Sequence, residues 1–410
     1  MNSRAEREHE SAVEPAQVAV IRPRLLVCVD WFDPGVRAGG PIRSCANLAV
    51  LLGKSADVAI ITSDRDLGSD QSYDAVPSDR WFNWRGLARV RYCSSGFRRC
   101  AAFVFMLRRF RPHAVYLNSM FSLAGTLWPL LWLRLTRRRI RIFLAPRGML
   151  KPAAMQQKGW KKRPLIWFLR TCGVLRHVSF HATSPEEAAE IHAAFGAVPV
   201  TAIPNVPCLP VSKLSDRTEK ACPARFCSVG RVHETKNILW LIELSGRVQG
   251  DCQLTIVGPV EDTTYHQRCL NAVRELPESV RVEFVGAKSE SEVREFLIQA
   301  DAMILPTLGE NFGHAIFESL AVGTPVIISD RTMWRDLQAR NAGWDLSLDA
   351  PDQFVSAMNA IIGMNHPEYR RLQQGALSLA HEFFEQHNLL SGYTNMFFGV
   401  APPAARAAVP

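Results

Sequence analysis

Short hydrophobic runs alternate with amphipathic segments along most of this 410-residue chain. Runs bounded by Gly, Pro or Asp indicate buried strands, and the segments between them repeat apolar residues at the spacing of a helix face. The expected strands cover residues 25–29, 58–62, 114–117, 140–145, 180–183 and 202–205, and then 225–229, 254–259, 280–286, 302–305 and 326–328. Strands that alternate with helices form parallel sheets. Because the chain is also too long for one hydrophobic core, the pattern predicts an α/β protein with two doubly wound domains.

The segments outside this pattern set the expected domain boundaries. Residues 1–22 are polar and mixed in charge, and residues 401–410 are rich in Ala and Pro, so we expect a disordered extension and a frayed tail, with no secretory leader. Residues 206–222, rich in Pro, Ser and charge, indicate an interdomain linker. The remaining segments are a first domain over 23–205, a second domain over 223–376 and a C-terminal helix over 377–400.

Glycines mark the first strand–loop–helix unit. Gly39 and Gly40 lie between the first strand and a helix expected over 42–52, where they would let the backbone approach an anion at the helix start. Arg43, in the first turn of that helix, could reach the same anion. In an open parallel sheet such a ligand binds beyond the carboxyl ends of the strands.

A second unit carries more specific chemistry. A helix expected over 314–322 follows a loop marked by Pro306 and Gly309, and the free amides of its first turn would form an anion-binding rim. Glu310 lies before this rim and Glu318 lies behind it. Carboxylates would repel a phosphate, so we expect these two to accept hydrogen bonds from hydroxyl groups. An anion flanked by hydroxylated groups describes a nucleotide sugar.

The segment from Glu310 to Glu318, with Asn311, Phe312 and Gly313 between, resembles the E-x7-E motif of retaining glycosyltransferase family 4, the "glycosyl transferases group 1". That resemblance extends over most of the chain, and it implies the GT-B fold: two Rossmann-like doubly wound parallel-sheet domains that face each other across a cleft.

Two further segments carry the resemblance. Gly230 and Arg231, followed by Lys236, resemble the G-R-x(n)-K-N element that holds the donor's phosphates in this family. Arg147, within Pro-Arg-Gly, resembles a loop of family members that build exopolysaccharide or lipopolysaccharide. The family often has a His after the strand over 114–117, where this chain has Asn118.

Roles for individual residues follow from the resemblance alone. It implies that Arg231, Lys236 and Glu310 are catalytic, with the two cations on the diphosphate and the carboxylate on the sugar hydroxyls. It implies a donor-binding set in which Glu318 holds the ribose, formed by Gly39, Gly40, Gly230, Lys288, Asn311, Phe312, Gly313, His314 and Glu318. Possible contacts to the acceptor or a phosphate are Arg43, Asn118 and Arg147.

Asp64-Arg65-Asp66 contains an Asp-x-Asp, the metal–diphosphate signature of a different glycosyltransferase fold. Here it follows a strand as a polar loop, and GT-B enzymes generally do not use a metal to hold the diphosphate. We therefore expect no metal and no other cofactor, with the nucleotide diphosphate sugar serving as donor substrate. Residues 64–68 also resemble a loop of one family 4 branch, and its role is not evident from its chemistry.

The net charge of +9 is unevenly distributed. Between Asp79 and Glu186 there are 22 Lys and Arg residues and no acidic residue. Solvated faces around a core helix would explain such a region, but its complete lack of acidic residues favours a surface that lies on anionic lipid, with aromatic and Leu side chains in the interface. No nucleic-acid motif accompanies it, so we expect no nucleic-acid partner. The apolar run over 121–133 is shorter than the roughly 20 residues that span a bilayer.

The sequence therefore predicts a retaining glycosyltransferase that moves a sugar to a hydroxyl of a glycan acceptor, often lipid-linked in this family, in cell-surface polysaccharide synthesis. Ten scattered Cys without metal-ligand spacing indicate reduced thiols, and we expect a cytoplasmic protein, peripheral on the inner face of the plasma membrane. Two alternatives stay open: a nucleotide-sugar epimerase of the same fold, and an inactive sugar-nucleotide-binding membrane scaffold.

Overall fold

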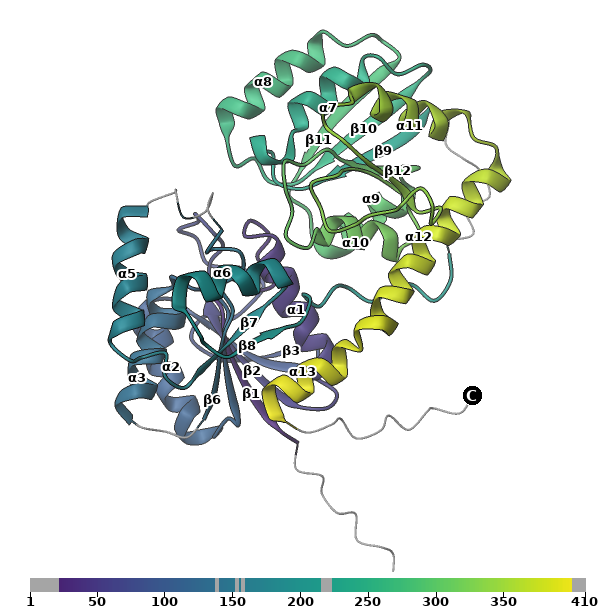
Figure 1. Cartoon of the computed structure of the whole chain (residues 1–410). Coiled ribbons are helices and arrows are strands. Elements are labelled where there is room, and N and C mark those ends of the chain that lie inside the picture. The colour runs from purple at the N-terminus through teal and green to yellow at the C-terminus, as the bar shows by residue number, and fades with distance from the viewer. Residues whose placement is uncertain (1–21, 137–139, 152–154, 156–158, 215–222, 400–410) are drawn as a thin grey trace, which may run out of the picture.

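The computed structural model describes residues 22–136, 140–151, 155, 159–214 and 223–399, which form two α/β domains (Figure 1). Except for Arg22, the extension expected over 1–22 lies outside the described residues, as do the tail over 401–410 and the linker from 215 onward. The predicted fold class, two doubly wound sheets facing across a cleft, is confirmed.

The first domain is built on an eight-stranded sheet in the order β3-β4-β2-β1-β5-β6-β7-β8. All of its strand pairs are parallel except β3 with β4, which is antiparallel. Its strands are β1 (Arg24–Cys28), β2 (Asp57–Ser63), β3 (Trp81–Trp84), β4 (Ala88–Cys93), β5 (Ala114–Leu117), β6 (Arg141–Leu144), β7 (Val178–Ala182) and β8 (Val200–Ala202). The sequence prediction missed both β3, where Asn83 interrupts three aromatic residues, and β4, where Arg89 and Arg91 interrupt the apolar pattern.

Helices cover both faces of this sheet. They are α1 (Gly40–Leu52), α2 (Gly96–Arg109), the π-helix η1 (Leu123–Leu127), α3 (Trp128–Thr136), α5 (Gly159–Thr171) and α6 (Pro185–Phe195). Side chains alternate across β1, so Leu25 and Val27 join the core under α1, whereas Leu26 and Cys28 join the core under α2, α3, α5 and α6. None of the described helices is both long enough and apolar enough to cross a bilayer.

The second domain has a six-stranded, all-parallel sheet in the order β11-β10-β9-β12-β13-β14. The strands are β9 (Ala224–Val229), β10 (Cys252–Val257), β11 (Val280–Gly286), β12 (Ala302–Leu305), β13 (Val326–Ser329) and β14 (Gly343–Leu346). The helices are the 3-10 turn η2 (Glu234–Lys236), α7 (Ile238–Ser245), α8 (Thr263–Arg274), α9 (Glu290–Gln299), α10 (His314–Ala321) and α11 (Pro351–Gly363). Each βα connection brings a loop to the same edge of the sheet, which faces the first domain (Figure 1).

Two helices lead the chain back to the first domain. The single helix expected over 377–400 is instead α12 (His366–His387) and α13 (Leu389–Phe398), separated by Asn388 in the left-handed conformation (φ 37°). Phe397 packs edge-on against Tyr116 and Phe143, with ring centroids 5.2 and 5.3 Å apart. Burying one such aromatic ring stabilises the fold by about 1.5–3 kcal/mol, so α13 is an integral part of the first domain.

Candidate functional site

A cavity of about 800 Å³ lies between the two domains. Its walls are the loop that joins β1 to α1 (residues 33–41, the glycine loop), the loop after β6, and the loops after β9, β10, β11 and β12. With one exception, Asn118, all the predicted catalytic, donor and acceptor residues line it. Predicted site residues that are far apart in the sequence thus line one cavity, because the two sheets face each other.

The turn after β9 presents Lys236 to this cavity. A Cβ on Gly230 would lie 3.2 Å from Lys236 Cε, and a Cβ on Gly258 would lie 1.9 Å from the Gly230 carbonyl oxygen. Gly230 therefore leaves room for the lysine stem, and Gly258 lets the backbones at the ends of β9 and β10 approach each other. Lys236 Nζ forms an ion pair with Glu310 Oε1, and the two side chains are 17% and 15% exposed. Neighbouring strands, β9 and β12, bring these residues together.

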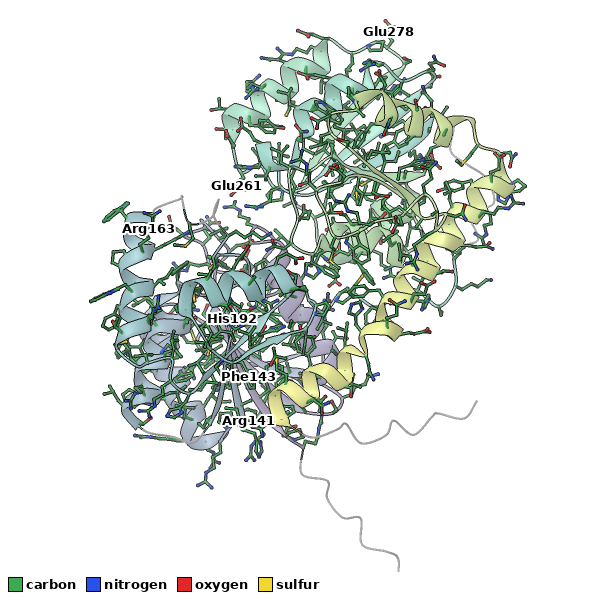
Figure 2. All side chains as sticks on the ribbon, viewed as in Figure 1. Arg141, Phe143, Arg163, His192, Glu261 and Glu278 are labelled. Atoms are coloured by element: carbon green, nitrogen blue, oxygen red, sulfur yellow. The ribbon has the colours of Figure 1, made fainter. Side chains whose placement is uncertain are left out.

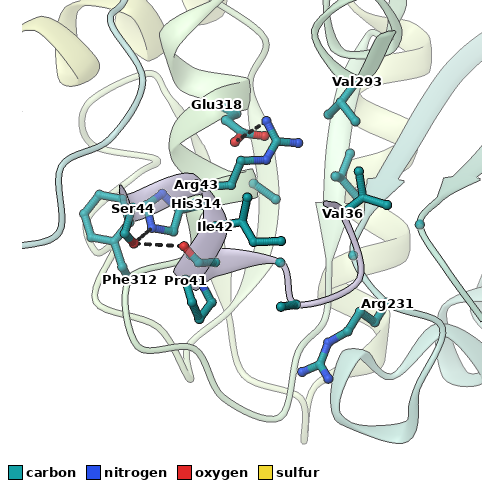
Figure 3. Close-up of a pocket in the computed structure, with 18 of the residues that line it drawn as sticks. Val36, Pro41, Ile42, Arg43, Ser44, Arg231, Val293, Phe312, His314 and Glu318 are labelled. Atoms are coloured by element: carbon teal, nitrogen blue, oxygen red, sulfur yellow. Dashed lines mark hydrogen bonds and ion pairs between the residues drawn. The ribbon is translucent and has the colours of Figure 1, made fainter. Parts of the chain in front are cut away.

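Arg231 lines the same wall, next to the glycine loop (Figure 3). Its Nη1 lies 2.6 Å from Glu261 Oε2, and both side chains are about 40% exposed. Glu261 borders the gap between the domains (Figure 2). No pattern in the sequence pointed to this partner, because 30 positions separate the two residues. An exposed pair of this kind contributes at most about 1 kcal/mol, so a phosphate oxygen can replace the carboxylate at low cost.

The start of α10 forms the expected rim of backbone amides. Gly313 caps the helix in the left-handed conformation (φ 75°), and the first intrahelical bond runs from Phe317 N–H to the Gly313 carbonyl at 3.1 Å. The N–H groups of residues 314–316 therefore have no acceptor within the helix. Phe312 anchors the loop from behind: its ring is buried, and its carbonyl accepts from Trp334 Nε1 at 2.7 Å.

Side chains of α1 and α10 meet across the cleft. Ser44 Oγ lies 2.8 Å from His314 Nε2. Burial, with repulsion from Arg147 and Arg43, lowers the pKa of His314 to about 3, so this ring is neutral. Figure 3 shows this contact beside the pairing of Arg43 with Glu318.

Arg43 Nη1 lies 3.3 Å from Glu318 Oε1. That nitrogen is buried and, among the described residues, has no hydrogen-bond acceptor, because the ion pair lacks hydrogen-bond geometry. Burial raises the pKa of Glu318, and the nearby guanidinium of Arg43 opposes this shift. The contact between Glu318 and the ribose thus stays a prediction. In the structure the Glu318 carboxylate faces Arg43 of the first domain.

Arg147 lines the cavity but directs its donors into the first domain. Its guanidinium donates to the side-chain oxygens of Asn118 and Asn205 and, at 2.7 Å, to Tyr116 Oη. Asn118 is 3% exposed, does not line the cavity and contacts Arg147, so the acceptor or phosphate contact predicted for it stays a prediction. The sequence interpretation missed Tyr116, which looks like an ordinary strand residue.

Glu187 holds the loop that carries Arg147. Ser184 caps the start of α6, where its Oγ accepts from Glu187 N–H at 3.2 Å, and the Glu187 carboxylate accepts from other donors. It accepts from the N–H groups of Gly148 and Thr183 at 2.6 and 2.7 Å. Gly148 in turn touches the second domain, since a Cβ there would lie 2.2 Å from Asn311 Nδ2.

Lys288, the last predicted donor residue, lies after β11 and pairs with Glu292 at 3.4 Å. Its Nζ thus pairs with a side chain of α9, and the residue also lines the cavity. Within the described ranges, no group of three or more His, Cys, Asp or Glu side chains is arranged to hold a metal ion.

Comparisons with known proteins agree with this arrangement. A family described as "Glycosyl transferase 4-like domain" matches residues 39–206, and one described as "Glycosyl transferases group 1" matches residues 215–377. Amylovoran biosynthesis glycosyltransferase AmsK of Erwinia amylovora is 31% identical over 150 residues, 34% of this chain and 35% of that protein. Lipopolysaccharide core biosynthesis glycosyltransferase LpsE of Rhizobium meliloti (strain 1021) is 28% identical over 173 residues, 41% of this chain and 49% of that protein. The match thus spans less than half the length of either relative.

Solved structures show the same fold. Sucrose-phosphate synthase from Thermosynechococcus elongatus superposes with a TM-score of 0.68 at 18% identity, over 92% of this chain and 100% of that one. Anabaena Alr3699/HepE, in complex with UDP and glucose, gives a TM-score of 0.66 at 13% identity and the same coverage. The two family matches fall on the two domains that enclose the cavity. The chain therefore belongs to the family 4 type of GT-B glycosyltransferases, the glycosyl transferases group 1.

Proposed function

We propose that this protein transfers a sugar from a nucleotide diphosphate sugar to a hydroxyl group of a glycan acceptor, with retention of configuration at the anomeric carbon. One observation carries the proposal: a single cavity joins two cations, Arg231 and Lys236, to the amide rim of α10 and to the carboxylates Glu310 and Glu318. Cations and free amides suit a diphosphate, and carboxylates suit the hydroxyl groups on either side of it.

The reaction breaks the bond between the anomeric carbon and the terminal phosphate oxygen, and the electron pair leaves with the nucleoside diphosphate. The acceptor oxygen bonds to the anomeric carbon on the same face, and its proton passes to the leaving phosphate. Arg231, Lys236 and the amides at Gly313 are fixed donors that stabilise the growing negative charge. Glu310 orients the sugar through its hydroxyl groups, and Glu318 holds the ribose. No step requires a metal ion.

Ligands in a similar structure and the names of two relatives suggest which donor to test first and which kind of product to expect. The structures of Alr3699/HepE hold UDP and UDP-glucose, which makes uridine diphosphate sugars the first donors to test. The two relatives are named for amylovoran and lipopolysaccharide core synthesis, which supports a cell-surface polysaccharide as the product.

The experiment that tests this function is a thermal-shift panel of UDP, GDP, ADP and their sugars, run with EDTA. We expect one diphosphate to raise the melting temperature and the shift to disappear in Lys236→Ala. Transfer is then followed with the matching sugar donor and a glycan acceptor, by release of the nucleoside diphosphate. A panel without any shift, or a shift that survives in Lys236→Ala, would contradict the proposed site.

We further propose that the acceptor is lipid-linked and that α3 and α5 rest on an anionic membrane. Both helices pack over the same face of the first sheet, and Figure 2 shows Arg163 of α5 on the outer side of that domain. Trp160 and Trp167 on α5 are 75% and 68% exposed. Other exposed apolar side chains on these helices are Leu131, Leu135 and Phe168. Aromatic side chains among basic ones suit the interface of an anionic bilayer. If that bilayer is the plasma membrane and the protein binds its inner leaflet, the enzyme lies on the cytoplasmic side.

A further inference from the structure

The Asp-x-Asp motif after β2 has no role in the site as described so far, and its two carboxylates point to different partners. Asp64 is buried and accepts from Ser78 Oγ at 2.7 Å. Asp66 Oδ2 accepts from the backbone N–H groups of Val36 and Arg37, at 2.8 and 3.0 Å. Carboxylates that bind one metal converge on one point, whereas these two hold separate parts of the protein.

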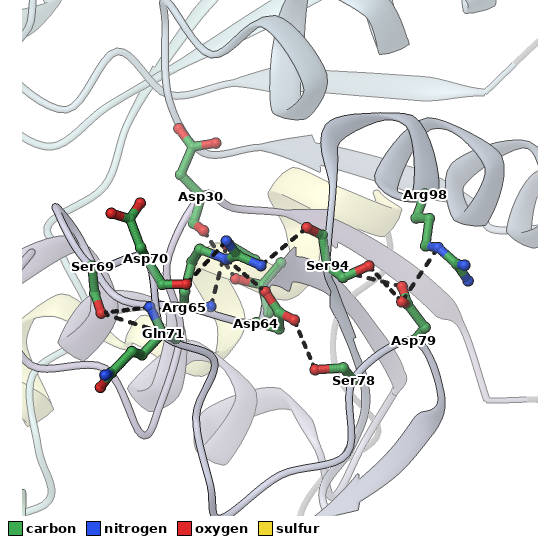
Figure 4. A network of polar contacts seen from close by, with 12 residues as sticks. Asp30, Asp64, Arg65, Ser69, Asp70, Gln71, Ser78, Asp79, Ser94 and Arg98 are labelled. Atoms are coloured by element: carbon green, nitrogen blue, oxygen red, sulfur yellow. Dashed lines mark hydrogen bonds and ion pairs between the residues drawn. The ribbon is translucent and has the colours of Figure 1, made fainter.

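Residues 64–73, which we call the platform, form a compact unit of their own (Figure 4). The N–H of Tyr73 donates to the Asp64 carbonyl at 2.7 Å and closes the unit. The Arg65 guanidinium donates to the Ser94 carbonyl, beyond the end of β4, at 3.3 Å. With Asp64 bonded to Ser78, the start of the platform is tied to the segments on either side of β3 and β4.

The glycine loop lies directly on this platform. A Cβ on Gly35 would lie 2.4 Å from Tyr73 Oη and 3.2 Å from Asp66 Oδ1, so the loop backbone is in contact with both side chains. Asp66 Oδ1 also accepts from Leu67 N–H at 2.8 Å, which fixes the orientation of the carboxylate. The opposite side of the loop, including Val36, lines the cavity.

Asp33 anchors the start of the loop by accepting from Trp84 Nε1 at 2.7 Å, but the residues next to the helix have few contacts of their own. Gly39 has φ 63° and ψ −121°, a conformation that only glycine adopts readily, and no atom would lie within 4 Å of a Cβ there. The N–H groups of Ile42 and Arg43 both bond to the Gly39 carbonyl, and Pro41 has no N–H. Of the N–H groups at this helix start, from Gly40 to Arg43 in the described structure, only that of Gly40 is thus left to donate to an anion. Its position depends on how the preceding residues are held.

We propose that Asp66 is a positioning residue: it holds the glycine loop so that the backbone at Gly39 and Gly40 faces the donor diphosphate in the same cavity as Arg231. The Asp-x-Asp motif in this chain thus serves substrate binding through backbone hydrogen bonds rather than through a metal. The effect of Asp66 on catalysis rests on the proposed function, but amide exchange shows whether Asp66 holds the loop without any substrate.

The test compares Asp66→Ala with Asp66→Asn and, as the matched control, Asp70→Ala in the exposed part of the same platform. Amide hydrogen exchange of the peptide over residues 33–41 reports on the loop, and kcat/KM for transfer reports on the reaction. Because bonds to a charged acceptor are stronger than ordinary ones, Asp66→Ala should speed exchange in the loop and lower kcat/KM, each by about tenfold.

Asp66→Asn should stay within about threefold of the wild type, because its amide oxygen can still accept from both Val36 and Arg37. Asp70→Ala should match the wild type in both measurements. Unchanged exchange of the loop in a folded Asp66→Ala would overturn the inference, as would faster exchange with unchanged kcat/KM. A wild type that transfers no sugar would refute the proposed function, while the exchange comparison would still show whether Asp66 holds the loop.

Discussion

Lys236 and Glu310 form an ion pair on the wall of the cavity, although they lie 74 positions apart in the chain. Lys236 follows β9 and Glu310 follows β12, and these two strands are neighbours in the second sheet. The carboxylate compensates the lysine's charge within the protein. Under the proposed function, a diphosphate that approaches Lys236 would compete with Glu310 for the lysine and free the carboxylate to accept from the sugar hydroxyl groups.

The first prediction concerns Lys236→Ala. It removes a fixed cation that stabilises charge on the leaving diphosphate, so kcat should fall by about 10²–10³. The measurement is steady-state sugar transfer, with the melting temperature recorded to confirm folding. Arg268→Ala is the matched control, since Arg268 is an exposed cation of the same domain, is paired with Glu234 and lies outside the cavity. A kcat for Lys236→Ala within twofold of the control would contradict the assigned role.

A second prediction compares two glycine substitutions, to separate the effect of backbone strain on stability from the effect of a contact between the domains on donor binding. Gly148 and Gly173 both have positive φ, 72° and 67°, so an added Cβ strains both by about 1–3 kcal/mol. At Gly173 nothing lies within 4 Å of that Cβ, whereas at Gly148 it would lie 2.2 Å from Asn311 of the second domain. Gly148→Ala should therefore weaken donor binding, and Gly173→Ala should lower stability alone. Calorimetric titration with the nucleotide and thermal unfolding would distinguish them; equal affinities would show that the contact does not matter for binding.

The strands of both sheets, and the motifs at their ends, were largely predictable from the sequence. Ala302–Leu305 is apolar throughout and is a buried strand with the expected bounds. The strand Ala88–Cys93 was missed because it has no continuous apolar run. Its two arginines lie at the less buried positions between apolar residues. The break at Asn388 was missed as well: the apolar pattern continues through it, and only the left-handed backbone conformation redirects α13.

Most residues that the sequence indicated for the site do line the cavity, but their contacts with one another were not predictable. Gly230, Lys236 and Glu310 each follow a strand of one parallel sheet, so a pattern of strands is enough to bring them to one edge. The pairing of Arg231 with Glu261, and of Arg43 with Glu318, depends on loop geometry and on how the two domains face each other. Neither leaves a periodic signal in a single sequence.

The third prediction is a loss of stability in acid. Burial lowers the pKa of both His314 and His181 to about 3, whereas the unfolded chain protonates histidine near its ordinary pKa of 6.5. Between these values the unfolded state binds more protons than the folded state. Their contribution to stability is therefore complete above pH 6.5 and is lost as the pH falls, by up to about 1.4 kcal/mol per pH unit for each histidine.

Urea unfolding at about pH 7, about 5.5 and about 4.5 measures this slope. His314→Gln can keep a hydrogen bond to Ser44 but cannot take up the proton, so its slope should be shallower than that of the wild type. His366→Gln, at the exposed start of α12, serves as the control. Equal slopes for His314→Gln and the wild type would show that this ring is not buried in its neutral form.

The last prediction tests the proposed membrane surface. The double variant Trp160→Ser/Trp167→Ser removes two exposed aromatic side chains from α5 and leaves its basic residues in place. Because electrostatic attraction brings this helix to the bilayer and the aromatic rings anchor it there, the variant should co-sediment less with phosphatidylserine vesicles. High salt should release the wild type, since it screens the attraction. Met333→Ser, which removes an exposed apolar side chain from the second domain, should bind as the wild type does. If the wild type fails to bind at low salt, or if the two variants bind equally, then α5 does not rest on the membrane, and its aromatic residues serve another partner.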